Sequence, residues 1–174
     1  MTLDCASVDD VVTLAKSLVF AASSNAILGD ATGKICSLEY SPNGAAAIPP
    51  DQGVVAHTNH FCDLRLAEKQ APLAQMLTTE PRLHCADAHI ADWPDEIDEA
   101  YLGMLLRDET GAVGIGATAV PDAKYGAICR SPDLSLPPDL RVESVFGVII
   151  NCDKRTMLVA PGIPSQVDFG LLAL

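Results

Sequence analysis

Basic residues are scarce in this chain of 174 residues. It has 11 Lys and Arg against 23 Asp and Glu, which gives a formal net charge of -12. Nucleic acids and anionic membranes both attract basic surfaces, so we expect neither as a partner. Aromatic residues are also few, at 5% of the sequence, whereas 49% of the residues are hydrophobic. A hydrophobic share of that size excludes a disordered chain and is typical of a folded domain.

Long apolar runs and an export signal are both missing. The longest apolar stretches, such as 145–150, are far shorter than the roughly 20 residues that a membrane-spanning helix needs. The first ten residues are acidic and lack the basic start and apolar centre of a signal peptide. We therefore predict a soluble, cytoplasmic protein. The C-terminal residues form no clear peroxisomal signal. A peroxisomal location stays the alternative to the cytoplasm.

The six cysteines include no CxxC pair, and without an export signal we expect them to be reduced and mostly buried. The run from His84 to His89 contains ligand-type residues, and on a helix Cys85 and His89 would share one face. No second cluster follows at zinc-finger spacing, and a zinc site needs three or four ligands. We therefore predict partly exposed helix residues here, with no metal and no cofactor.

Secondary-structure signals alternate along the chain. Ser7 can cap a helix whose apolar residues recur at helical spacing as far as Val19. Turns rich in Gly, Pro and Asn then separate short apolar segments, which predicts antiparallel strands at 25–30, 34–40, 45–48 and 54–59. Later patterns predict a helix over 95–107, a loop over 108–124, a short strand over 127–130 and a hairpin of 142–151 with 156–160. This mixture indicates an α/β chain of the α+β type, in a single domain over residues 1–174.

The segment 145–150 is apolar at every position, so we expect both faces of this strand to be covered. The predicted helices are too few to cover both faces of the predicted strands. We therefore expect the chain to pack against further protein. The alternative is a compact sandwich whose strands are merely rich in alanine.

The densest polar cluster is His57-Thr-Asn-His60, at the end of a predicted strand. On a strand His57 and His60 would point to opposite faces, which makes them a poor pair of metal ligands. The carboxamide of Asn59 could donate to a developing oxyanion, an interaction worth on the order of 3 kcal/mol when preorganised. The alternative is an asparagine that satisfies the backbone groups of a turn.

Several blocks of sequence resemble the isopenicillin N acyltransferase family, also called the C45 peptidases. The specific block is Val55–Phe61, which contains the His-Thr-Asn-His run, and Ser24–Lys34 and Leu38–Pro42 precede it as weaker blocks. Weaker blocks follow in the family's order at 105–109, 127–130, 141–150 and 157–164. The resemblance covers most of the chain, although residues 63–100 match poorly.

This resemblance implies an N-terminal-nucleophile hydrolase with a four-layer α-β-β-α sandwich of antiparallel sheets. Members cleave themselves before a Cys, whose thiol becomes the nucleophile and whose α-amine becomes the general base. They hydrolyse an amide or transfer an acyl group, in some cases from an acyl-coenzyme A thioester. The implied partner is therefore a small acyl or amide substrate.

The resemblance also implies roles for individual residues. Asn59 matches the oxyanion-hole Asn, Arg141 matches an Arg near the nucleophile, and His57 and His60 match supports of the substrate site that orient the Asn. The family's Gly-Cys junction lies upstream of every matched block, and none of the six cysteines has the nucleophile's context. We therefore expect the C-terminal part of such an enzyme, which needs a complementary N-terminal segment or subunit. The alternative is a non-catalytic remnant that binds acyl ligands or a homologous subunit.

Overall fold

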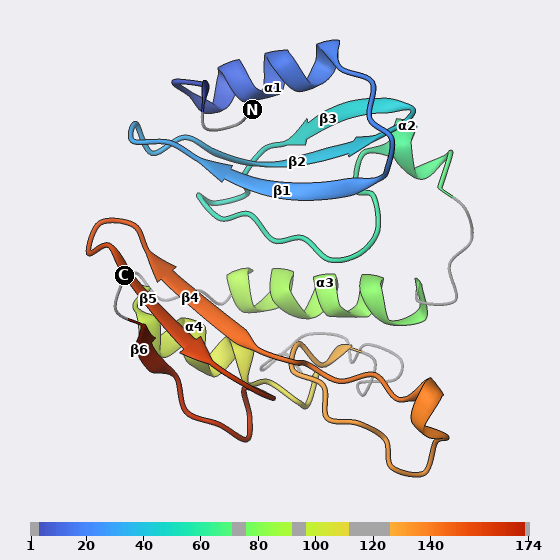
Figure 1. Ribbon diagram of the computed structural model, residues 1–174, viewed down its shortest axis with the longest axis vertical. Helices are drawn as coiled ribbons and strands as arrows, with labels where there is room; N and C mark the ends of the chain where they lie inside the picture. Colours follow the sequence, from blue (N-terminus) through green and yellow to red (C-terminus); the bar gives the residue numbers. More distant parts are fainter. Residues whose placement is uncertain (1–3, 71–75, 92–96, 112–125, 173–174) are drawn as a thin grey trace. The chain divides into compact units, whose positions relative to one another are not determined.

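The computed structural model describes residues 4–70, 76–91, 97–111 and 126–172. The chain divides into two compact units, Met1–Met76 and Leu77–Leu174, and each is described by itself. Together they contain helices and two three-stranded antiparallel sheets (Figure 1), which confirms the predicted α+β class. None of the described helices is long and apolar enough to cross a membrane. The four-layer stacking and the single domain stay predictions.

The first unit is a helix packed on a three-stranded sheet. Its elements are α1 (Val8–Ser17), β1 (Ser24–Gly29), β2 (Ile35–Ser41), β3 (Gly44–Ile48) and the short α2 (Leu64–Ala67). Ser7 caps α1, because its hydroxyl accepts a hydrogen bond from the backbone N–H of Asp10 at 3.2 Å. The predicted cap and the first three predicted strands are therefore confirmed.

The central strand β2 is buried on both faces. Successive side chains of a strand point to opposite faces, so Leu38 lies on one face and Ser37 and Glu39 on the other. Leu38 forms the core with Val11 and Ala15 of α1, which covers this face in Figure 1. Ser37 and Glu39 are fully buried at 0% exposure, although they are polar. The second face therefore needs hydrogen-bonding partners rather than apolar ones.

The fourth strand predicted at 54–59 is wrong. Asp51 and Val54 form one isolated β-bridge around Gln52 and Gly53, whose φ angles of 47° and 81° are left-handed. Beyond this turn the chain forms no strand as far as α2. Glu39 instead accepts hydrogen bonds from backbone N–H groups farther along this segment, and a strand ladder does not form.

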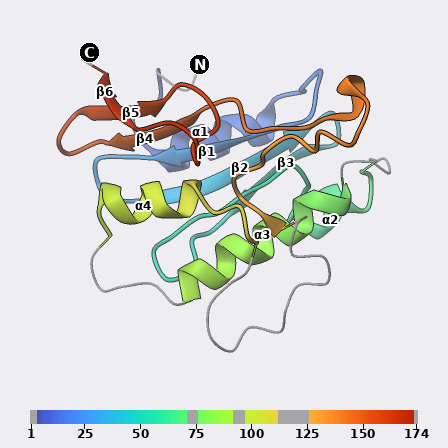
Figure 2. The same ribbon diagram turned by 90° about the horizontal axis from the view of Figure 1, so that it is seen from below.

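The second unit contains α3, α4, the 3-10 turn η2 and a second sheet. The bounds are α3 (Met76–Ala91), α4 (Glu99–Leu106), η2 (Pro138–Leu140), β4 (Gly147–Asn151), β5 (Thr156–Ala160) and β6 (Gly170–Leu172). The predicted hairpin is confirmed by β4 and β5, which lie side by side with β6 in Figure 2. The predicted helix over 95–107 is α4, capped by the side chain of Asp98.

Some boundaries differ from the prediction. β4 begins at Gly147 rather than at 142, and β6 was not predicted. The predicted strand over 127–130 is wrong. The backbone N–H of Cys129 donates a hydrogen bond to the carbonyl of Asp108, and the backbone of Arg130 is hydrogen-bonded to Ser144. These hydrogen bonds hold a loop in place, and residues 127–130 form no strand. Residues 112–124 of the predicted loop lie outside the described residues.

The two faces of β4 differ. Gly147 and Ile149 are buried on the face that packs against α4, where a Cβ on Gly147 would come within 2.9 Å of the Phe169 ring. Ile150 on the opposite face is 59% exposed. Among the residues that the structure describes, this strand is therefore covered on one face only.

Candidate functional site

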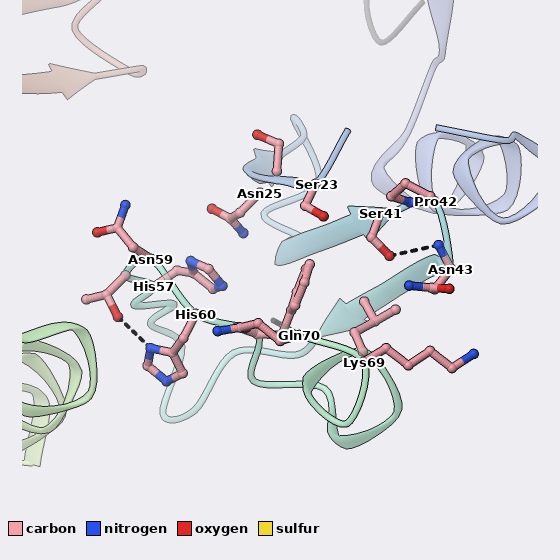
Figure 3. A pocket seen from close by; sticks show the side chains of 14 residues that line it. Ser23, Asn25, Ser41, Pro42, Asn43, His57, Asn59, His60, Lys69 and Gln70 are labelled. Carbon is pink, nitrogen blue, oxygen red and sulfur yellow. Dashed lines mark hydrogen bonds between the residues drawn. The ribbon is translucent and has the colours of Figure 1, made fainter. Parts of the chain in front are cut away.

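A pocket of about 710 Å³ lies in the first unit. It is bordered by the start of β1, the turn between β2 and β3, the segment 57–61 and the residues after α2 (Figure 3). Three of the predicted site residues line it, namely His57, Asn59 and His60. Sequence reasoning missed the other polar lining residues, which include Asn25, Ser41, Asn43, Lys69 and Gln70.

The buried carboxylate of Glu39 anchors the segment that carries the predicted residues. Its Oε1 lies 2.8 Å from Nε2 of His57 and accepts the backbone N–H of Cys62 at 2.6 Å, and its Oε2 accepts that of Asp63 at 3.0 Å. Burial raises the pKa of Glu39, whereas these hydrogen bonds lower it. The lowering is the larger effect, so the net pKa is below the ordinary 4.5. An ionised carboxylate therefore joins β2 to the pocket segment.

His57 and His60 are placed differently. The side chain of His57 is only 7% exposed and its Nε2 contacts Glu39, so this residue supports the segment that precedes Asn59. Nδ1 of His60 lies 3.1 Å from the hydroxyl of Thr58, across Asn59 in the sequence. These two contacts border Asn59 on both sides. A substrate contact of either histidine stays a prediction.

Asn59 itself is exposed and lines the pocket. Figure 3 shows it beside His57, on the opposite side of the pocket from Asn43 and Lys69. Because its neighbours are hydrogen-bonded, the backbone under its carboxamide is held in place. The role of this carboxamide as a donor to an oxyanion stays a prediction.

Two further amides belong to the pocket. Asn25 of β1 donates a short hydrogen bond to the hydroxyl of Ser37. Gln70 accepts the backbone N–H of Phe61 at 2.9 Å through Oε1, while its buried Nε2 has no hydrogen-bond partner among the described residues. A buried donor without an acceptor costs about 1–3 kcal/mol, so an acceptor from a ligand or water would stabilise it. Neither residue carried a sequence signal beyond its residue type.

Arg141, the fourth predicted residue, belongs to the second unit. Its Nε donates to the carbonyl of Leu136 at 2.8 Å and its Nη2 to that of Leu134 at 3.2 Å. Its described hydrogen bonds thus close a local loop before β4. A role beside a nucleophile stays a prediction.

All six cysteines are free thiols in the structure. Cys36, Cys85 and Cys129 are buried and Cys152 is exposed. Burial raises the pKa of the Cys36 and Cys85 thiols, which disfavours the reactive thiolate at both positions.

Comparison with known families gives a match over more than half of the chain. The model of the family described as acyl-coenzyme A:6-aminopenicillanic acid acyl-transferase matches residues 1–119. This range includes the pocket and the blocks between Ser24 and Phe61, and the match confirms the resemblance seen in the sequence. The comparison with curated proteins found no match.

Proposed function

Because the chain belongs to the acyl-coenzyme A:6-aminopenicillanic acid acyltransferase family, we propose that its pocket is the carbonyl-polarising side of an acyl-transfer or amide-hydrolysis site. Asn59 is the donor to the oxyanion, and His57 and His60 hold it in position and border the substrate. The observation that carries the proposal is the placement of Asn59. It lines the pocket on a segment that the buried Glu39 fixes to β2.

The reaction follows from the family's chemistry. A cysteine thiolate attacks the acyl carbonyl carbon, and the π electrons move onto the oxygen, which becomes an oxyanion. The tetrahedral intermediate collapses, the C–N or C–S bond to the leaving group breaks, and that group takes the proton that the nucleophile's α-amine had accepted. Water or a second amine then attacks the acyl-enzyme thioester and gives a proton to the α-amine. The C–S bond to the cysteine breaks, and the sulfur regains its proton as the free thiol. An amide N–H from Asn59 stabilises the charge in both halves of the reaction.

The attacking cysteine in this proposal comes from a complementary N-terminal segment or subunit that carries a Gly-Cys junction, and Arg141 lies beside it. Within the chain, burial raises the thiol pKa of Cys36 and Cys85, which disfavours these two residues as the nucleophile.

The proposed substrate is an N-acyl amide or an acyl-coenzyme A thioester. The pocket lining is rich in amides and hydroxyls, which suits a polar amide. Lys69 is the only Lys or Arg among the lining residues, and its side chain is exposed, so it could pair with a phosphate of coenzyme A.

Co-expression with a segment carrying Gly-Cys tests the proposal. The reconstituted protein should turn over members of a panel of N-acyl amides and acyl-coenzyme A thioesters. Asn59→Ala should lower kcat by about 10²–10³, the usual effect of removing one oxyanion donor, with little loss of stability. Asn43→Ala is the matched control, since it removes another pocket carboxamide and should keep most of the turnover. Equal turnover by wild type and Asn59→Ala would remove the proposed role.

A non-catalytic binding role is the second candidate. The observation that favours it is an exposed apolar row on the second sheet, where Ile150 and Leu172 are 59% and 49% exposed and pair with Met157 between them. In that case the chain alone should bind a homologous subunit or an acyl ligand in calorimetry without covalent labelling by acyl probes. Titrations without heat would count against it.

A further inference from the structure

A cluster of Cys85, His89 and Asp108 lies in the second unit. Cys85 and His89 are four residues apart on α3, and Asp108 follows the C-terminal cap of α4 at Arg107. One ligand atom from each residue lies within 4.8 Å of the other two. We propose that these three side chains bind a divalent transition metal, with Zn²⁺ as the expected ion.

The distances suit one ion. Sγ of Cys85 lies 3.3 Å from Oδ2 of Asp108, and Nε2 of His89 lies 3.8 Å from the same oxygen. Around a tetrahedral zinc with ligand bonds of about 2.0–2.3 Å, neighbouring ligand atoms are about 3.2–3.8 Å apart. Three protein ligands also leave a fourth position for water. The cluster therefore needs only small adjustments to surround an ion.

The imidazole of His89 is the second observation that points to a ligand. Its Nε2 is buried, yet it makes no hydrogen bond with any described residue. The 3.8 Å separation from Asp108 is too long for a hydrogen bond. Buried polar atoms are nearly always paired, so an unpaired imidazole nitrogen beside a thiol and a carboxylate calls for a missing partner. A metal ion supplies that partner.

Neighbouring groups hold the carboxylate and the helix in place. Oδ1 of Asp108 accepts the backbone N–H of Thr110 at 2.9 Å and its hydroxyl at 2.6 Å, so that Oδ2 is left for Cys85. The hydroxyl of Tyr101 donates to the backbone carbonyl of His89 at 3.1 Å. Such outer hydrogen bonds orient the ligands of metal sites and are a regular part of them.

Two other interpretations fit less well. A Cys-His nucleophile needs the histidine next to an accessible thiol, whereas Cys85 is 0% exposed and its sulfur contacts Asp108. A site for Mg²⁺ or Ca²⁺ would be built from oxygen ligands, but this cluster offers one thiol and one imidazole. The sequence shows only two ligand-type residues on one face of this helix, which is why it predicts no metal. The fold adds Asp108 as the third ligand.

Cobalt spectroscopy tests the site directly. The chain, kept reduced and freed of metal with a chelator, should bind one equivalent of Co²⁺ and develop a thiolate-to-cobalt absorption in the near ultraviolet. Zn²⁺ should displace the cobalt and remove this absorption. Cys85→Ser should abolish the charge-transfer band, and Asp108→Asn should weaken binding by about tenfold or more.

Two exposed residues provide matched controls. His84→Ala on the same helix and Cys152→Ser should both bind cobalt as the wild type does. A wild-type chain without the charge-transfer band, or a band that survives in Cys85→Ser, would overturn the proposal. If Cys85→Ser does not fold, as judged by circular dichroism, His89→Ala decides the question, because unchanged cobalt affinity in that variant also overturns it.

Discussion

The two units each bury one carboxylate beside a histidine and a cysteine, but they satisfy it differently. Glu39 in the first unit accepts hydrogen bonds from two backbone N–H groups and contacts Nε2 of His57 at 2.8 Å. Asp108 in the second unit contacts Cys85 but lies 3.8 Å from Nε2 of His89, which stays without a hydrogen bond. In the first cluster the histidine nitrogen is hydrogen-bonded to the carboxylate, whereas in the second it makes no hydrogen bond with any described residue.

The carboxylate pKa is lowered in both clusters. Burial raises the pKa of Asp108, but hydrogen bonds from Thr110 and Cys85 and the nearby His89 bring it below the ordinary 3.8. Burial, and then the adjacent Asp108, raise the pKa of Cys85 to about 12. In the metal-free protein the second cluster therefore holds one negative charge rather than two.

The largest expected effect is the loss of the Glu39 carboxylate. Glu39→Ala leaves His57 and two backbone N–H groups without their acceptor, so the free energy of unfolding should fall by about 3–5 kcal/mol. Urea unfolding followed by circular dichroism measures this loss. Asp9→Asn removes the exposed partner of Lys34 and is the control, with stability close to that of the wild type. A loss below about 1 kcal/mol in Glu39→Ala would show that the carboxylate does not anchor the segment.

A pair of histidine substitutions compares the two clusters directly. His57→Leu removes a hydrogen-bond partner of a buried carboxylate and should cost about 1–3 kcal/mol of unfolding free energy. His89→Leu removes a nitrogen that makes no hydrogen bond with any described residue, so in the presence of a chelator it should cost less than about 1 kcal/mol. Urea unfolding of both variants under the same conditions gives the two values. Equal losses would remove the distinction between the two clusters.

The smallest expected effect is the pH dependence of the Glu39 contribution. The pKa of Glu39 is lower in the folded protein than its ordinary value of 4.5, so the folded state binds fewer protons than the unfolded state. Its contribution is therefore present above that value and is lost as the pH falls through the folded-state pKa. The stability difference between wild type and Glu39→Gln should shrink when urea unfolding is repeated below pH 4.5. A difference that stays constant would show that the carboxylate is not held ionised.

Local features of the chain were predictable. The Ser7 cap, the strands β1, β2 and β3 and the hairpin of β4 and β5 depend on neighbouring residues and tight turns. The strand expected at 54–59 did not form, and Glu39, about 20 residues earlier, instead contacts the side chain of His57 and accepts the backbone N–H groups of Cys62 and Asp63. Sequence periodicity carries no information on such a long-range partner.

The candidate sites were likewise predictable only in their local parts. A resemblance carried by the run of His57 to His60 placed three residues in a pocket, and helical spacing correctly put Cys85 and His89 together on one helix. The sequence could not show that Glu39 lies under the first group or that Asp108 joins the second, since each is separated from its partners by many residues.

The sequence by itself therefore determined the family, the mixed class of fold and the residue types able to polarise a carbonyl. The tertiary structure decided which buried charges are paired and which nitrogen is left without a partner. The physical reason is that propensities and turns act over a few residues, whereas the pairing of a buried polar group depends on whichever distant segment the fold brings within about 3 Å of it.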